Sequence, residues 1–122
     1  MQLQLEFPRS FQLWTYTVSH AQLLLRSNKT DQYRTRIDVL FKDVGRICLA
    51  SKMDAVAIKR INNNEFKLYS SFSDEKELRR RNIYVLLSNE SKINYIIAGS
   101  MSWNEDSGDY NDESVFQKSL GI

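Results

Sequence analysis

Apolar and polar residues alternate along much of this 122-residue chain, and the alternation is most regular at residues 34–41. The charged positions of this stretch are Arg34, Arg36 and Asp38, interrupted only by Leu40, and the other positions are Thr35, Ile37, Val39 and Phe41. This pattern predicts an antiparallel strand in the middle of a sheet, with the apolar row in the core and the charged row in water. The alternative is a closed barrel with the charged row inside, where each charge would need a partner.

Shorter runs before this stretch predict further strands. Residues 22–26 are expected to pair with it as a hairpin across a polar loop. Residues 2–7 predict an edge strand, because Pro8 ends the run and cannot donate to a ladder. In residues 11–18 the alternation changes phase after Leu13, which predicts either burial of both faces or a β-bulge.

Turn residues divide the chain after residue 41. Asp, Val and Gly at 43–45 predict a turn into a separate strand around Ile47. Residues 55–71 predict a hairpin, because the three asparagines at 62–64 tolerate a left-handed reverse turn. Residues 82–103 predict a second hairpin that is apolar on both faces. Further turns are expected at 51–54 and 88–91.

Two segments favour short helices. Residues 73–81 begin with a capping serine, carry acids in the first turn and end in three arginines, so their charges complement the helix dipole. Because Leu78 is almost its only apolar residue, a mobile loop is the alternative. Residues 115–120 are expected to close the chain as a second short helix.

These elements predict a single domain over residues 1–122 that is mainly β. We expect an antiparallel sandwich or partly open barrel of about eight strands, with one or two short helices. The single cysteine allows no internal disulfide, which favours a reducing compartment, and we expect a cytoplasmic protein. The sequence shows no signal-peptide pattern and no apolar run near the roughly 20 residues that a membrane span needs.

The charges are unevenly distributed along the chain. Residues 105–122 hold five acids and one lysine, whereas residues 1–104 hold sixteen bases and ten acids, so the net charge of +2 conceals a basic body and an acidic end. Solvated surface charge is the ordinary explanation. An acidic end would also attract a partner of opposite charge.

Residues that could carry chemistry are few. His20 is the only histidine, and its neighbour Ser19 alone carries no catalytic information, so we expect a structural or surface role. Cys48 lies in an apolar run, which predicts a buried, inert thiol. Residues 106–109 resemble part of a calcium loop but lack its length and its closing glutamate. We therefore expect no enzyme activity, no cofactor and no resident metal.

The leading hypothesis is a non-enzymatic protein-binding module, such as a small bacterial adaptor or toxin-neutralising protein. Its partner would be another protein, held by the acidic loop with a tryptophan as the aromatic centre of the interface. The predicted contact residues are Trp103, Glu105, Asp106, Asp109, Asp112 and Glu113.

The rival hypothesis is an anion-binding protein that takes a phosphate ligand, a nucleic acid or a phospholipid headgroup. Its positive charge would come from Lys76, Arg79, Arg80 and Arg81, with Lys59, Arg60 and Lys67 as further candidates. Such binding would weaken steeply with salt. No aromatic nucleic-acid motif interrupts this cluster and the net charge is small, so this hypothesis ranks second.

Overall fold

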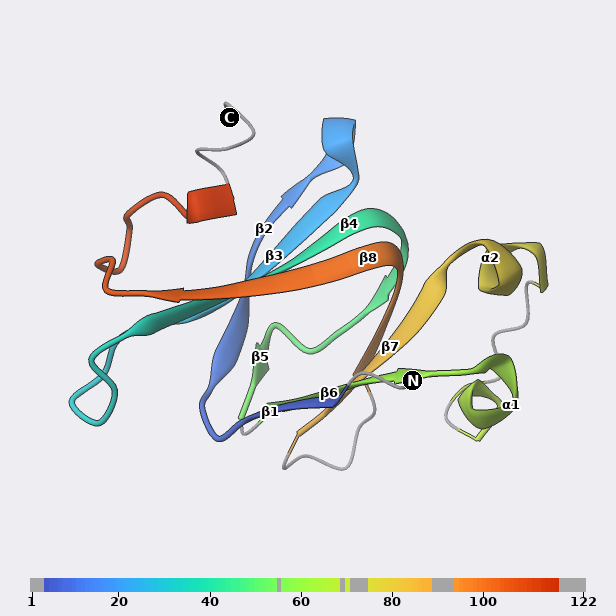
Figure 1. Ribbon diagram of the computed structural model, residues 1–122, viewed down its shortest axis with the longest axis horizontal. Coiled ribbons are helices and arrows are strands. Elements are labelled where there is room, and N and C mark those ends of the chain that lie inside the picture. The colour runs from blue at the N-terminus through green and yellow to red at the C-terminus, as the bar shows by residue number, and fades with distance from the viewer. Residues whose placement is uncertain (1–3, 55, 69, 71–74, 89–93, 117–122) are drawn as a thin grey trace.

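The computed structural model describes residues 4–54, 56–68, 70, 75–88 and 94–116 (Figure 1). In chain order the elements are β1 (Gln4–Phe7), β2 (Phe11–Thr17), the 3₁₀ turn η1 (Val18–His20), β3 (Gln22–Ser27), β4 (Arg36–Cys48), β5 (Lys52–Met53), β6 (Val56–Ile61), α1 (Asn63–Phe66), α2 (Glu75–Arg80), β7 (Asn82–Leu87) and β8 (Asn94–Asp106). The eight strands form one antiparallel sheet in the order β1-β6-β7-β8-β4-β3-β2-β5, which is not closed into a barrel. This confirms the predicted fold class.

The strands predicted before residue 42 are confirmed. Residues 36–41 of the regularly alternating stretch form the first half of β4, which lies inside the sheet between β3 and β8. β1 is an edge strand. In β2 the register against β3 shifts between Leu13 and Thr15, so Trp14 is the extra residue of a bulge.

The turn predicted at 43–45 is wrong, because β4 continues through it to Cys48. Asp43 adopts a left-handed backbone with a φ of 53°, and the register against β8 shifts between Val44 and Arg46. Residues of the types found at 43–45 suit either a turn or a β-bulge. They form a bulge here because the ladder with β8 continues on both sides of them. The result is one long, bent strand instead of two short ones.

β4 and β8 bend sharply together at this bulge (Figure 1). Gly99 of β8 lies against the bulge, where a Cβ would come within 2.9 Å of Oδ2 of Asp43. Arg81, the residue just before β7, holds Asp43: its Nε donates to the Asp43 carbonyl and its Nη2 to Oδ1, both at 2.9 Å. The core-facing positions change parity here, from Phe41 to Val44 in β4 and from Ala98 to Met101 in β8.

The bend folds the sheet over a single main core to which all eight strands contribute. The buried residues of this core are Phe7, Phe11, Leu23, Leu25, Ile37, Val39, Phe41, Val44, Met53, Val56, Ile58, Tyr84, Leu86, Ile96 and Ala98. A smaller cluster lies on the other side of β6, β7 and β8 and includes Phe66 of α1 and Leu78 of α2. It comprises Ile61, Phe66, Ile83, Val85, Tyr95 and Ile97, with Leu78 packed against it. The two clusters explain why the 82–103 hairpin is apolar on both faces.

The hairpin predicted over residues 55–71 is wrong after β6. Asn62 caps helix α1 instead, because its side chain accepts a hydrogen bond from the backbone N–H of Glu65 at 2.8 Å. Phe66, at the end of that helix, is fully buried with its ring 5.0 Å from that of Tyr95. Asparagine suits helix caps as well as reverse turns, so the asparagine run does not distinguish them.

Four smaller predictions have different outcomes. The segment 51–54 was expected to turn, yet it contains β5, which pairs with the start of β2. The helix predicted at 73–81 is present as α2. The turn at 88–91 and the helix at 115–120 lie largely outside the described residues. Within the described part of the chain, no helix is long and apolar enough to cross a membrane.

Replacing Gly99 with Ala should destabilise the fold by about 1–3 kcal/mol, because the new Cβ would overlap the side chain of Asp43. Asp43→Gly removes both this overlap and the left-handed strain, so the double variant should be more stable than the sum of the single changes predicts. Urea denaturation of the wild type, the two single variants and the double variant measures the coupling energy between the two positions. Additive effects within about 0.5 kcal/mol would contradict it.

Candidate functional site

Two of the three residues of the charged row Arg34, Arg36 and Asp38 are buried, which corrects the prediction that this row lies in water. Arg36 is 2% exposed and Asp38 is 1% exposed, whereas Arg34 is exposed. Residues 107–116, which we call the covering segment, fold back over this outer face of the sheet, away from the main core (Figure 1). Leu40, the apolar exception in the charged row, is 4% exposed and was a sequence signal of this cover.

Arg36 organises the covering segment through a single guanidinium. Its Nε and Nη2 donate to the two carboxylate oxygens of Asp106 at 3.0 Å each, in the bidentate geometry that is strongest for this pair. Nη1 donates to the backbone carbonyls of Asp109 at 3.1 Å and Asp112 at 2.6 Å. Nη2 also donates to the carbonyl of Glu113 at 3.1 Å. One side chain thus fixes the backbone at three points.

The pair formed by Arg36 and Asp106 is electrostatically strong. The hydrogen bond from Arg36 is the main cause that lowers the pKa of the Asp106 carboxyl, and the same bond raises the pKa of Arg36. The backbone N–H of Gly108 adds a hydrogen bond to Asp106 at 2.9 Å. A Cβ on Gly108 would lie 2.5 Å from Nη2 of Arg36, so only glycine allows the chain to pass this close.

A second buried arginine supports the covering segment further along. Arg26 donates from Nε and Nη2 to both oxygens of Asp38, at 2.8 and 3.2 Å, and from Nη1 to the carbonyl of Tyr110 at 3.1 Å. Its guanidinium lies 4.6 Å from the centre of the Trp14 ring, and the Tyr110 ring meets Trp14 edge to face at 5.1 Å. The bulge in β2 therefore places Trp14 on the outer face, where it completes this stack.

Three of the predicted acidic residues form what we call the acidic surface: Asp109, Asp112 and Glu113. Their backbone carbonyls face Arg36, and all three side chains are exposed. The Asp109 side chain is 84% exposed and pairs with Lys29 at 3.2 Å. Asp112 accepts a hydrogen bond from the backbone N–H of Asp109 at 2.9 Å, which further orders the segment. Asp106, by contrast, has a structural role.

Trp103 and Glu105 are not part of this acidic surface. Alternate residues of β8 point to opposite faces, so these two lie on the core side, whereas Asp106 lies on the outer face. Trp103 is 44% exposed and meets the ring of Phe7 at 5.4 Å. Glu105 lies 4.0 Å from Nη1 of Arg9. The structure thus divides the sequence-predicted surface into two.

The basic cluster is partly engaged within the protein. Arg81 is 11% exposed at its side chain and clamps Asp43, and Arg80 lies 3.8 Å from the same carboxylate. The hydrogen bond from Arg81 is the main cause that lowers the pKa of Asp43. Lys76 and Arg79 are exposed on α2. The structure therefore leaves fewer cations facing solvent than the sequence predicts.

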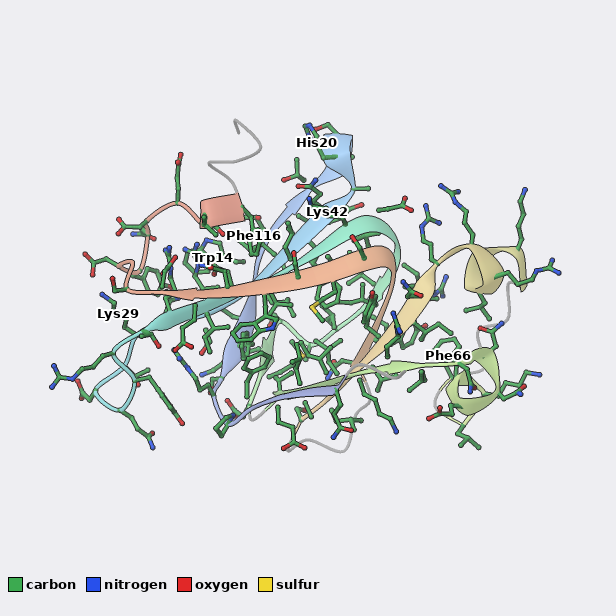
Figure 2. The ribbon with its side chains drawn as sticks, in the orientation of Figure 1. Trp14, His20, Lys29, Lys42, Phe66 and Phe116 are labelled. Atoms are coloured by element: carbon green, nitrogen blue, oxygen red, sulfur yellow. The ribbon has the colours of Figure 1, made fainter. Side chains whose placement is uncertain are left out.

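The two residues considered for catalysis are both exposed. His20 lies at the tip of the β2–β3 hairpin, with Nδ1 2.9 Å from the hydroxyl of Ser19 (Figure 2), which confirms a surface position. Cys48 is exposed, so the predicted burial is wrong. It lies at the end of β4, beyond the residues that pair with β3. Among the described residues, no three His, Cys, Asp or Glu side chains gather as metal ligands would.

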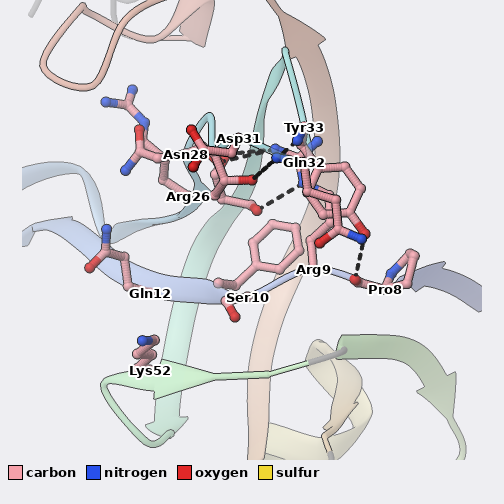
Figure 3. Close-up of a pocket in the computed structure, with 13 residues that line it drawn as sticks. Pro8, Arg9, Ser10, Gln12, Arg26, Asn28, Asp31, Gln32, Tyr33 and Lys52 are labelled. Atoms are coloured by element: carbon pink, nitrogen blue, oxygen red, sulfur yellow. Dashed lines mark hydrogen bonds between the residues drawn. The ribbon is translucent and has the colours of Figure 1, made fainter.

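The structure also shows an open cleft of about 570 Å³ between the loop after β3 and the strands β2 and β5 (Figure 3). Arg9 forms its base and is 6% exposed. Its Nε donates to the hydroxyl of Ser27 at 3.1 Å, and its Nη2 reaches the carbonyls of Asn28 and Thr35. Burial lowers the pKa of Arg9. No local pattern distinguishes this arginine in the sequence.

Comparison with protein-family models, curated proteins and solved structures gives no match for this chain. Its function is therefore inferred from the residues described above.

Arg36→Ala should lower the free energy of unfolding by about 2–4 kcal/mol, because it leaves Asp106 and three carbonyls without their donor. Arg36→Lys should recover little of the free energy of unfolding that Arg36→Ala loses, since an ammonium lacks the planar fork of a guanidinium. The matched control is Arg34→Ala, an exposed position just before the same strand, where less than about 0.5 kcal/mol is expected. Urea denaturation measures all three. Equal effects of the two alanine changes would contradict the role of Arg36.

Stability should fall in acid partly through Asp106. The pKa of Asp106 is lower in the folded state than in the unfolded state. Its carboxylate therefore stabilises the fold fully above the unfolded-state pKa of about 4, and this stabilisation is lost as the pH falls through the lower folded-state pKa. Asp106→Asn should be less stable at neutral pH but lose less stability between about pH 5 and pH 2. Urea denaturation across this range tests the prediction. Parallel pH profiles of the two proteins would exclude it.

Proposed function

We propose that this chain is a non-enzymatic protein-binding module that receives a basic partner protein on the acidic surface. A small adaptor or toxin-neutralising protein would work in this way. We infer a cytoplasmic location, because the single cysteine fits a reducing compartment. The binding of Arg36 to the backbone of the covering segment is the observation that carries the proposal.

This backbone anchorage favours binding because it orders the acidic residues before a partner arrives. The carbonyls of Asp109, Asp112 and Glu113 are held by Arg36, so the three side chains extend from a fixed backbone into water. A loop that is already ordered loses less conformational entropy on binding. The exposed pair of Asp109 with Lys29 competes little, because surface ion pairs contribute about 0–1 kcal/mol.

Charge and an aromatic side chain complete the proposed contact. Three neighbouring carboxylates attract a basic partner over a distance and accelerate association. Tyr110 lies among them, is 56% exposed and is held edge to face on Trp14. A rigid, half-exposed tyrosine is a common anchor at protein interfaces. It takes the place predicted for Trp103, which lies on the other face of β8.

The anion-binding alternative has weaker support. Arg80 and Arg81 both approach the carboxylate of Asp43, and Arg81 is needed at the bend of the sheet. A phosphate would have to compete with that carboxylate for the same donors.

Removing the charge of the acidic surface should abolish partner capture without unfolding the protein. In the variant Asp109→Asn/Asp112→Asn/Glu113→Gln, the backbone carbonyls that bind Arg36 remain. The immobilised chain is incubated with an extract of its source cells. The amount of each partner protein retained should be at least about tenfold lower on this variant than on the wild type. Mass spectrometry after crosslinking measures the recovery.

The matched control removes three charges elsewhere, as Glu6→Gln/Asp54→Asn/Glu65→Gln, and should retain the same partners as the wild type. Equal recovery on both variants, an equal loss on both, or no protein retained above background would each exclude the proposed surface.

A further inference from the structure

One side of β8 has no strand beside it over the second half of its length. β7 pairs with β8 only from Asn94 to Ala98, before the bend (Figure 1). From Ser100 to Asp106, β8 pairs with β4 alone, in a regular register without a bulge. Every residue of this stretch is exposed or half-buried. The stretch, which we call the open edge, is therefore accessible along its whole length.

The open edge presents main-chain groups that the chain itself does not use. In an antiparallel ladder, successive residues direct their N–H and C=O groups alternately to the two sides of the strand. About half of the residues from 100 to 106 thus direct these groups away from β4. Within the described part of the chain, no backbone group outside the ladder with β4 is hydrogen-bonded to them. Such an edge is a template for one more strand.

The two ends of the sheet, by contrast, carry features that prevent strand addition. β1 has four residues and is followed by Pro8. The start of β2 is covered by β5, and the bulge at Trp14 interrupts the strand beyond it. Short edges, prolines and bulges all disfavour pairing with another chain. The open edge is longer, contains no proline or lysine, and carries charge only at its last two residues, Glu105 and Asp106.

The charges around the open edge indicate which kind of strand it would take. Between residues 94 and 116 the sequence contains five acids and no Lys, Arg or His. Two of these acids end the open edge, and the chain then continues into the covering segment, which carries the acidic surface. A strand that follows the open edge therefore meets increasing negative charge, which favours basic side chains. A second copy of this chain would bring further carboxylates instead.

Trp103 supplies an apolar contact at the same edge. Its ring is 44% exposed on the core side of β8 and meets the ring of Phe7 edge to face at 5.4 Å. The residue opposite Trp103 on an added strand would lie on the same face, and cross-strand pairs with an aromatic side chain stabilise a sheet. Ser100, Ser102 and Asn104 lie on the outer face, where their small side chains leave room for long basic ones.

We propose that the partner protein adds an extended basic segment to the open edge of β8, as a ninth strand of the sheet. Main-chain hydrogen bonds hold this segment, an apolar side chain packs on Trp103, and its basic side chains continue onto the acidic surface. The pairing is inferred from the unused main-chain groups and from Trp103, whereas the basic character of the segment rests on the function proposed above.

The probe is a synthetic peptide selected on the wild-type protein from a phage-displayed library. Each library member has twelve residues, with Lys or Arg at every second position and random residues between them. Binding should slow amide hydrogen exchange at least about tenfold at alternate residues between 100 and 106, because their N–H groups become hydrogen-bonded to the peptide. NMR measures the exchange residue by residue. Without peptide, the chain should sediment as a monomer.

Substitution and N-methylation distinguish strand addition from attraction by charge alone. Trp103→Ala should weaken peptide binding at least about fivefold. The matched control Tyr16→Ala, which removes an exposed aromatic side chain of β2, should bind like the wild type. N-methylation of the peptide should weaken binding at least about tenfold at residues of one parity only, since only alternate N–H groups face β8. Thermal denaturation verifies that each variant folds.

The variant Asp109→Asn/Asp112→Asn/Glu113→Gln separates this inference from the proposed function. Weaker binding to this variant, with the same amides protected, supports both. Unchanged affinity with those amides protected supports strand addition and contradicts the acidic surface. Binding that leaves the amides at 100–106 unprotected overturns strand addition, whatever its affinity for the variant.

Four other results would also overturn strand addition. They are the selection of no peptide, equal binding to Trp103→Ala and Tyr16→Ala, an effect of N-methylation that shows no parity, and a free chain that is a dimer with these amides already protected.

Discussion

The fold depends on the bend that β4 and β8 share at Asp43 and Gly99. Without it, one antiparallel sheet of eight strands would leave its apolar face open to water. With it, the first half of β4 and its neighbours lie across the core from β1, β6 and β7, so one sheet supplies both sides of the core. The bend requires a left-handed Asp43, a residue without a side chain opposite it, and Arg81, which binds the carbonyl and the carboxylate of Asp43.

Buried arginines hold the segments that the main core does not reach. Arg36 and Arg26 fix the covering segment, and Arg9 fixes the loop after β3. Each satisfies backbone carbonyls as well as side chains, which a hydrophobic contact cannot do. Since an Arg without its partners is costly to bury, these contacts also specify one arrangement of each segment. The acidic surface is built on such an arginine, which gives it a fixed shape before a partner arrives.

The proposed acidic surface would attract its partner from a distance. The acidic surface offers charge, which acts over several ångströms and depends on salt.

The alternation of apolar and polar residues was enough to predict most strands, the pairing around β4, the edge position of β1 and the irregularity in β2, because these follow from local pattern. It could not decide between turn and bulge at 43–45 or between turn and helix cap at 62–64, since the same residues suit both and the neighbouring strands determine the outcome. Nor could it predict the burial of Arg36 and Asp38. Alternation shows which side chains share a face of a strand, but what covers that face is decided by residues 107–116, about seventy positions further along the chain, which reach it only in the folded molecule.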